Sequence, residues 1–217
     1  IAKGTDKKLA IMNVLRKFIK DSSKVRFEGD GYSEGWVKEA KKRGLANVKD
    51  TPRALDAFLS KKTVDLYKKF NVLSELELEA RNEIKLENYI MKVQIESRSI
   101  GDLAHSHIIP TAIKYQNKLI DNANGLKDLK LDNKHVKLTI DNVSKQLKVV
   151  MTEVDKMIDE RRRVNKIEDP RKKAIAYCDD VKGKYFDIIR HAVDKLELLV
   201  DDEDWPLPKY REMLFIK

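Results

Sequence analysis

An apolar repeat between residues 136 and 157 constrains the fold of this chain more than any other feature. Its side chains stand at alternating steps of four and three residues: Val136, Ile140, Val143, Leu147, Val150, Val154 and Met157. This spacing places them on one face of an α-helix, where they pack against companion helices. A helix over residues 132–165 would be roughly 50 Å long, at about 1.5 Å per residue. The repeat therefore predicts a long helix that lies lengthwise against others.

A second long helix is expected before this one. Ser74 and Glu77 have the spacing of a capping box, in which each side chain binds the other residue's backbone N–H. The helical pattern then continues to about Asp121, and a turn is expected over residues 122–125. Pro110 lacks a backbone N–H and crowds the preceding turn, so we expect a kink there with helix continuing beyond it. The apolar stripe of this helix contains Leu86, Ile90, Val93, Ser97, Ile100, Ala104 and His107.

A third long helix is expected to start at Asp169-Pro170, with the aspartate as N-cap and the proline in the first turn, and to run to about Val200. Its apolar stripe contains Ala174, Cys178, Val181, Tyr185, Ile188, Ala192, Leu196 and Leu199. The short link before it makes it antiparallel to the helix over 132–165. The predicted fold class is all-α: an antiparallel bundle of long helices preceded by several short helices.

Shorter elements occupy the first third of the chain. Asp6 can cap a helix that runs to about residue 21, and glycines at 29 and 31 indicate a turn. Ser33 is a candidate N-cap for a helix over 34–43, which Gly44 ends. Further short helices are expected after Thr51-Pro52 and after Ser60. We therefore divide the chain into a short-helix segment, residues 1–73, and a long-helix bundle, residues 74–217, whose apolar tail folds back.

Composition agrees with this fold class and narrows the function. The chain has 8 glycines, 5 prolines and 37% charged residues, against roughly 25% charged in an average domain. So few turn residues disfavour β-sandwiches and glycine-looped nucleotide folds. The longest stretch without a charged residue, 103–113, is too short to span a membrane. No signal segment opens the chain and Cys178 stands alone, so a reducing, cytoplasmic setting is expected; the start at Ile1 suggests a fragment.

No catalytic, cofactor-binding or metal-binding residue is predicted. His105 and His107 are about 200° apart on a helix and cannot share a metal, which would require a spacing of four residues. His135 and His191 have no ligand pattern around them. Cys178 falls on an apolar stripe, where a free cysteine behaves as a small apolar residue.

A cluster of basic residues lies in the turn between the last two long helices. It contains Arg161, Arg162, Arg163, Lys166, Arg171, Lys172 and Lys173. A solvated hairpin tip explains such a cluster, and so does contact with an acidic surface such as that of a sister subunit. The net charge of +9 allows a nucleic-acid partner, but acids and bases alternate along most of the chain. The possible assembly contacts are Arg161, Arg162, Arg163, Arg171, Lys172 and, in the tail, Trp205.

Several segments, in order along the chain, resemble the region that follows the catalytic part of type III glutamine synthetases. They are Phe27-Glu28-Gly29-Asp30-Gly31-Tyr32-Ser33, Trp36 to Ala40, Arg43-Gly44-Leu45, Glu79 to Ile84, Leu86 to Tyr89, Ile108-Ile109-Pro110, Leu198 to Asp202, Trp205-Pro206 and Glu212 to Phe215. Asp30, Ser97 and Leu207 depart from the family pattern. Residues 121–170 match it only in helical character.

The resemblance implies a parent ligase that joins glutamate and ammonia with ATP through a γ-glutamyl phosphate, aided by Mg²⁺ or Mn²⁺. It implies a ring-shaped homo-oligomer, usually a double-ringed dodecamer, whose glutamate, metal and nucleotide motifs lie upstream of this segment. Residues 1–73 would then follow the catalytic region, and the chain alone would be inactive, with a structural, assembly or regulatory role. The alternative is a stand-alone helical adaptor or nucleic-acid-binding bundle that uses the basic turn 161–173.

Overall fold

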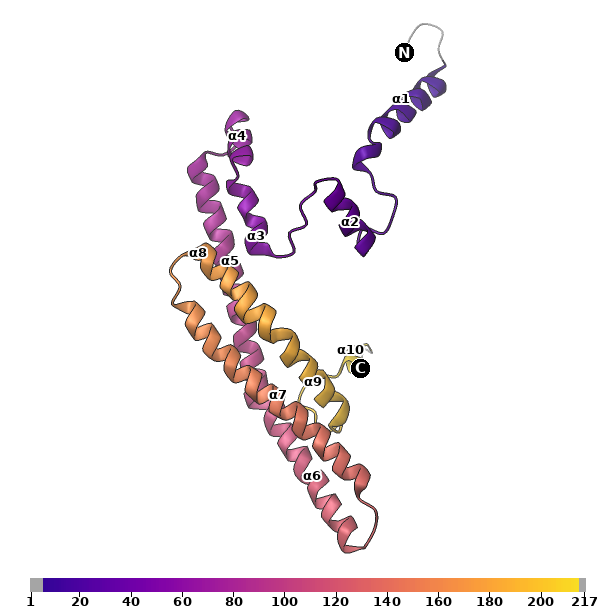
Figure 1. The fold of residues 1–217 in the computed structure, drawn as a ribbon, viewed down its shortest axis with the longest axis vertical. Coiled ribbons are helices and arrows are strands. Elements are labelled where there is room, and N and C mark those ends of the chain that lie inside the picture. Colours follow the sequence, from indigo (N-terminus) through magenta and orange to yellow (C-terminus); the bar gives the residue numbers. More distant parts are fainter. Residues whose placement is uncertain (1–5, 215–217) are drawn as a thin grey trace. The chain divides into compact units, whose positions relative to one another are not determined.

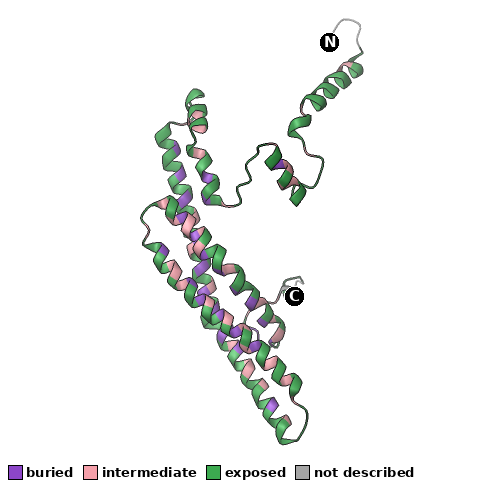
Figure 2. Ribbon diagram, in the orientation of Figure 1, coloured by how far each residue is buried: buried purple, intermediate pink, exposed green. Residues whose placement is uncertain are grey.

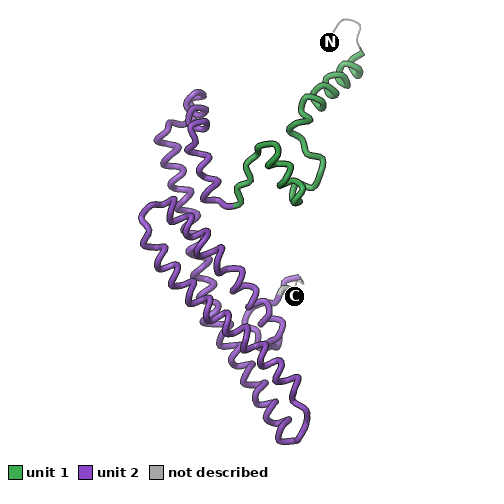
Figure 3. Tube along the Cα trace, viewed as in Figure 1, with its two compact units in different colours: residues 1–49 green, residues 50–217 purple. Residues whose placement is uncertain are grey.

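The computed structural model describes residues 6–214, apart from the side chains of residues 210 and 211. Within these residues the regular structure is entirely helical, which confirms the all-α prediction. The chain forms two compact units, residues 1–49 and residues 50–217 (Figure 3). None of the described helices is long and apolar enough to cross a membrane. The two units are treated separately below.

The first unit contains little buried surface. Its described elements are α1 (Lys7–Asp21), the 3₁₀ turn η1 (Ser23–Val25) and α2 (Glu34–Lys42). Asp6 precedes α1 as predicted, although its side chain makes no capping hydrogen bond. No residue of α1 is buried, and its apolar side chains are exposed, among them Leu15 and Phe18 (Figure 2). Within the described residues, helix α1 therefore has its intrahelical backbone hydrogen bonds but contributes no residue to a core.

Helix α2 begins and ends where the sequence predicts. The Ser33 hydroxyl accepts a hydrogen bond from the Trp36 N–H at 3.3 Å, and this caps the first turn. Gly44 follows the helix with φ of +74°, a left-handed conformation that glycine adopts without strain. The Phe27 and Trp36 rings contact each other with centroids 4.7 Å apart. The segment that carries the family resemblance is thus built around a capped helix and an aromatic pair.

Arg43 holds the loop before α2 against the end of that helix. Its guanidinium donates to the backbone carbonyls of Lys24 at 3.0 Å and Arg26 at 2.8 Å. Its Nε donates to the Glu39 carboxylate at 2.8 Å, and this bond lowers the pKa of Glu39. One side chain therefore satisfies several acceptors that the loop itself leaves unpaired.

The second unit opens with short helices that pack on its long ones. They are α3 (Thr51–Ala54), the 3₁₀ turn η2 (Leu55–Leu59) and α4 (Lys61–Lys69). The Asp50 side chain caps α3 by accepting from the Arg53 N–H at 2.9 Å. Leu55 packs with Leu86 and Ala174 in a small core cluster. The sequence analysis placed a boundary between residues 73 and 74, where the expected helices become longer. In the structure this position lies inside the second unit, which begins at residue 50.

Long rods form the body of this unit (Figure 1). The first rod is α5 (Glu75–Leu103), the π-helical turn η3 (Ala104–Ile108) and α6 (Ile109–Asp128); the second is α7 (Lys134–Asn165); the third is α8 (Pro170–Ala176), the π-helical segment η4 (Tyr177–Phe186) and α9 (Asp187–Leu199). Rod two packs against both others, antiparallel to each. After α9 the tail returns to the bundle and includes α10 (Tyr210–Met213).

Helix α7 buries the apolar repeat predicted for it. Val143, Leu147, Val150, Val154 and Met157 are all buried, and Val136 and Ile140 are half-buried. The predicted capping box is also present at the start of α5: the Ser74 N–H donates to Glu77 Oε2 at 2.7 Å. Asp169 likewise caps α8 by accepting from the Lys172 N–H. The predictions of antiparallel long helices and of their N-terminal caps are confirmed.

The expected turn over residues 122–125 is wrong. Helix α6 continues through these residues to Asp128, and the turn to α7 lies at 129–133, where Lys130 has φ of +59°. Gly125 lies inside this helix, and a glycine at an interior position destabilises a helix by only about 1 kcal/mol relative to alanine. Burial of Ala123, whose carbonyl also accepts from the Asn133 side chain at 3.0 Å, outweighs that cost.

Near Pro110 the helix continues as predicted, and the distortion takes the form of the π-helical turn η3 just before the proline. A π-helical turn holds more residues than an α-helical turn, so it moves the next buried position along the sequence. Ile108 is therefore buried, and His107, expected on the apolar stripe, is exposed.

The π-helical segment η4 also shifts the buried positions along the sequence, and over more residues than η3 does. Tyr177, Val181, Tyr185 and Ile189 are buried at successive steps of four residues. Ile188, predicted on the buried stripe, is 46% exposed, and Cys178 is only half-buried. A regular α-helical repeat assigns these positions to the wrong face because the backbone is wider there.

Candidate assembly surface

The basic turn joins α7 to α8, and several of its arginines are already paired within the bundle. Arg162 Nη1 lies 2.8 Å from Asp159 Oδ1, one turn earlier on α7. Arg163 Nη2 lies 2.7 Å from Glu160 Oε1 and 2.6 Å from Asp180 Oδ2 of η4. The bond from Arg163 lowers the pKa of Glu160. Arg163 thus ties the second rod to the third.

Arg171 connects α8 to the short helices at the start of the unit. Its Nε and Nη2 donate to the two carboxylate oxygens of Asp56 at 2.6 and 2.7 Å, a bidentate geometry. A parallel bridge joins Arg53 of α3 to Asp179 of η4, with Nη2 and Oδ2 2.6 Å apart. Each arginine lowers the pKa of its aspartate partner. Ion pairs between residues distant in sequence therefore position α3 and η2 on the third rod.

Arg161 and Lys172 occupy different environments. Arg161 is half-buried, and its Nη1 donates to the hydroxyl of Ser97, a fully buried residue of α5, at 3.5 Å. Lys172 is exposed. The candidate assembly residues therefore do not form a single patch: Arg163 and Arg171 bridge elements of the unit, Arg161 faces inward, and Arg162 and Lys172 remain on the surface.

Trp205, the candidate contact in the tail, belongs to the core. Its side chain is 7% exposed and packs in the main apolar cluster, with Leu207 against it. The neighbouring Asp204 pairs with Lys114 and Lys118 of α6, and these bonds lower its pKa. The prediction that the tail folds back is confirmed for Trp205, whereas Phe215 lies outside the described residues. An indole buried in this way offers little surface to a second subunit.

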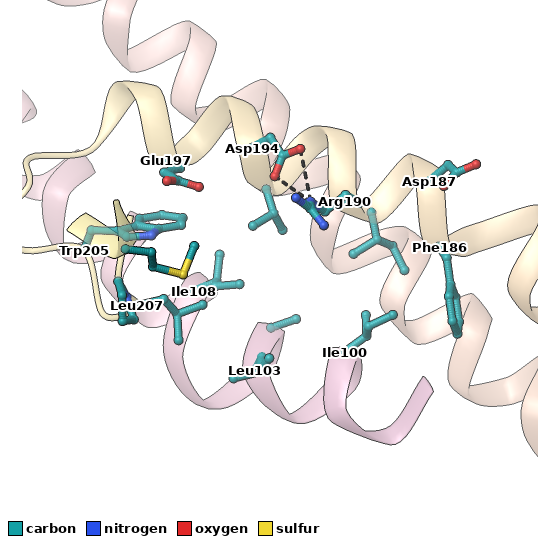
Figure 4. Close-up of a pocket in the computed structure, with 15 residues that line it drawn as sticks. Ile100, Leu103, Ile108, Phe186, Asp187, Arg190, Asp194, Glu197, Trp205 and Leu207 are labelled. Carbon is teal, nitrogen blue, oxygen red and sulfur yellow. Dashed lines mark hydrogen bonds and ion pairs between the residues drawn. The ribbon is translucent and has the colours of Figure 1, made fainter. Parts of the chain in front are cut away.

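Beside the tail the bundle is hollowed by an apolar groove of about 510 Å³ (Figure 4). Ile100, Leu103 and Ile108 line one side, and Trp205 and Leu207 close the end nearest the tail. Its charged rim comes from α9, where Arg190 Nε donates to Asp194 Oδ1 at 2.8 Å. Such a lining suits apolar side chains and supplies no nucleophile with an adjacent base.

A small polar cluster where the three rods meet was not predicted from the sequence, and it joins the exposed Asn165 to buried residues. The Tyr177 hydroxyl donates to Asn165 Oδ1 at 2.6 Å, and the Gln94 amide donates to the same oxygen at 2.9 Å. Ser97 lies next to it and donates to the Gln94 carbonyl at 2.9 Å. The available signal was Ser97 itself, a polar residue on an otherwise apolar stripe. These hydrogen bonds give partners to the hydroxyl groups of Tyr177 and Ser97, the two buried residues of the cluster.

The acidic, histidine and cysteine side chains of the described residues are the groups that could bind a metal ion. Across residues 6–214 no group of three or more His, Cys, Asp or Glu side chains is arranged to hold a metal ion. His105 Nε2 lies 3.4 Å from Asp155 Oδ1, an exposed pair on neighbouring rods. Ion pairs, caps and apolar packing account for the charged and polar contacts described above.

The chain is similar in sequence to part of several glutamine synthetases. It is 40% identical to a glutamine synthetase of Bacteroides fragilis (strain YCH46) and 29% identical to the type-3 glutamine synthetase of Dictyostelium discoideum, with 99% of the chain covered in both cases. A glutamine synthetase of Butyrivibrio fibrisolvens is 27% identical over 98% of the chain. The chain spans about 30% of the length of each of these relatives.

The model of one protein family, described as the glutamine synthetase C-terminal domain, matches residues 10–127. The match extends from α1 to the end of α6 and so includes the capped helix α2 and the long helix α5. It confirms the resemblance to type III glutamine synthetases seen in the sequence. The chain belongs to the glutamine synthetase C-terminal domain family.

Proposed function

We propose that this chain is the helical, noncatalytic part of a glutamine synthetase, and that it stabilises the subunit and contributes to assembly or regulation. The observation that carries the proposal is the match of nearly the whole chain to about 30% of proteins named glutamine synthetase. The complete enzyme would join glutamate and ammonia at the expense of ATP, with Mg²⁺ or Mn²⁺, in cytoplasmic nitrogen assimilation. Its partners would be the rest of its own polypeptide and sister subunits of a ring.

The distribution of charge supports a scaffold role for the second unit. Arg53, Arg163 and Arg171 connect elements far apart in sequence through short ion pairs. Arg162 and Lys172 lie on the surface and do not connect elements of the unit. We therefore propose these two residues as contacts with another subunit. Most arginines of the basic turn are paired with carboxylates, which disfavours the alternative of an adaptor or nucleic-acid-binding bundle, since that needs free cations along one face.

The first test measures ATP-dependent glutamine formation. The 217-residue chain alone should form no glutamine above background. The longer polypeptide encoded by the complete reading frame that contains this chain should form glutamine. Robust synthesis by the isolated chain would overturn the noncatalytic assignment. A surrounding frame without any ligase-like region would overturn the proposed parent enzyme.

The second test concerns assembly and uses the longer polypeptide. Charge reversal at the two surface residues, Arg162→Glu with Lys172→Glu, should reduce the oligomer mass measured by light scattering. Lys127→Glu, at the far end of the bundle, is the matched control and should leave the mass unchanged. An unchanged mass in the double variant would remove these residues from the assembly surface.

A further inference from the structure

A shallow hollow lies where the first and second rods pack together, within two turns of the C-terminal end of α7. Its volume is about 260 Å³, large enough for a small ion and its first waters. The α5–η3 side supplies Arg98, Asp102 and His105, and α7 supplies Arg161. Gly101 forms part of the floor, where a Cβ atom would lie 3.6 Å from the Ile158 side chain.

The two arginines of this hollow differ from their neighbours in having no carboxylate partner. Within the part of the chain that the structure describes, neither Arg98 nor Arg161 has a carboxylate partner within ion-pair distance, whereas Arg162 has one and Arg163 has two. Arg161 reaches only the Ser97 hydroxyl, at 3.5 Å. Two arginines therefore line one small hollow together with one carboxylate, Asp102, and neither arginine forms an ion pair with it.

The environment of Arg161 makes this arrangement costly. Burial removes water from its guanidinium and lowers its pKa, and the positive charge of Arg98 lowers it further. Like charges at short range repel one another, more strongly where water is partly excluded. A bound anion would relieve both the repulsion and the loss of hydration.

The acidic groups around the hollow limit the size and charge of that anion. Asp102 lines it but accepts a hydrogen bond from the Ser106 hydroxyl at 3.2 Å, and Asp155 lies against His105. With a neutral histidine, the two arginines and Asp102 leave the lining with one net positive charge, and Asp155 lies beside His105 rather than in the lining. This charge suits one oxyanion group rather than the row of phosphates of a nucleic acid, which needs many cations.

We propose that this hollow binds a single phosphate-type oxyanion between the guanidinium groups of Arg98 and Arg161. The planar fork of N–H donors on each arginine matches the oxygen spacing of such a group. The phosphate group has two possible sources, free inorganic phosphate or the phosphate of a nucleotide. This site goes beyond the scaffold role, because neither subunit assembly nor stabilisation of the bundle requires a bound anion.

The test follows the arginine Nε–Hε signals of the whole 217-residue chain by NMR during titration with sodium phosphate at constant ionic strength. Saturable shifts are expected at Arg98 and Arg161. Arg161→Gln should weaken binding about tenfold or more, as expected from losing hydrogen bonds to a charged group. Arg162→Gln, the exposed neighbour that pairs with Asp159, should bind phosphate like the parent chain.

Arg98→Gln provides a second variant at an exposed position, so that a folding defect at Arg161 does not decide the outcome. A parallel titration with adenosine monophosphate separates the sources: tighter binding than phosphate indicates a nucleotide, and equal binding indicates the free ion. Chemical shift changes at Arg98 and Arg161 that do not saturate with phosphate would contradict the proposed site. Equal affinity in the parent chain and both glutamine variants would overturn it too.

Discussion

Helix α7 and the third rod, formed by α8, η4 and α9, both contribute buried residues to the main core cluster, but they have different backbone geometries. Helix α7 is α-helical throughout, and its buried residues alternate at steps of four and three. The third rod contains the π-helical segment η4, and from Tyr177 to Ile189 its buried residues stand at steps of four.

This difference shows that two spacings of buried residues go with two backbone geometries. A regular helix with a heptad repeat keeps its stripe against the partner by slight supercoiling. A helix whose apolar residues fall every four positions drifts away from the partner, unless its turn widens to hold more residues. The wider turn keeps Tyr185 and Ile189 in the core cluster that they share with α7.

The largest effect is expected at the centre of the regular helix. Leu147→Ala should lower the free energy of unfolding by about 2–5 kcal/mol, because the removed side chain is buried and leaves a cavity. Leu138→Ala, on the same helix but 60% exposed, is the control and should change it by less than about 0.5 kcal/mol. Chemical denaturation measures both, and equal effects would show that the packing face of α7 is misassigned.

Adjacent isoleucines test the widened turn directly. Ile189→Ala should destabilise by about 2–5 kcal/mol, since the side chain is 3% exposed, whereas Ile188→Ala should cost far less at 46% exposure. A regular α-helix with the heptad register predicts the opposite order. Denaturation of the two variants side by side therefore decides between a π-helical and an α-helical third rod.

Two helical glycines form another matched pair. A Cβ at Gly183 would lie 3.0 Å from the Cys178 carbonyl oxygen, and we expect Gly183→Ala to destabilise by about 1–3 kcal/mol. Gly125 in α6 has open space around it, so Gly125→Ala should stabilise by about 0.5–1 kcal/mol. Thermal unfolding should shift in opposite directions. Stabilisation by both alanines would contradict the π-helical geometry of η4.

The smallest effect is expected from the bridge between Arg171 and Asp56, because both side chains are about half exposed and solvent screens them. Arg171 holds the pKa of Asp56 below its ordinary value. The bridge therefore stabilises the fold fully when the pH is above the ordinary pKa of an aspartate. This stabilisation is lost as the pH falls through the lower pKa that Asp56 has in the folded chain. A double-mutant cycle with Arg171→Gln and Asp56→Asn, measured at neutral and at acid pH, should give coupling only at neutral pH.

The sequence was sufficient to predict features that depend on local rules. The repeat in α7 and the caps at Ser33, Ser74 and Asp169 follow from spacing and short-range hydrogen bonding, and each is present. The π-helical segments were missed because their register depends on contacts with another rod, although Gly183 in the middle of a predicted helix was an available signal. The turn at 122–125 failed because tertiary packing outweighed the preference of Gly125.

The candidate assembly residues were predictable as a set of charges but not in their roles. The sequence places Arg161, Arg162 and Arg163 side by side, yet each points to a different partner: Ser97 on another rod, Asp159 on the same helix, and Asp180 across the turn. Which way a long side chain turns depends on the surface that the fold brings next to it. Trp205, predicted as a possible assembly contact, packs in the core of its own unit.

The burial of Trp205 also makes the molecule convenient for spectroscopy. The chain has 2 tryptophans, and each compact unit holds one: Trp36 beside Phe27 in the first and Trp205 in the core of the second. Replacing either indole with phenylalanine leaves an intrinsic fluorophore that reports on a single unit. Emission can then follow the melting of each unit without an attached dye.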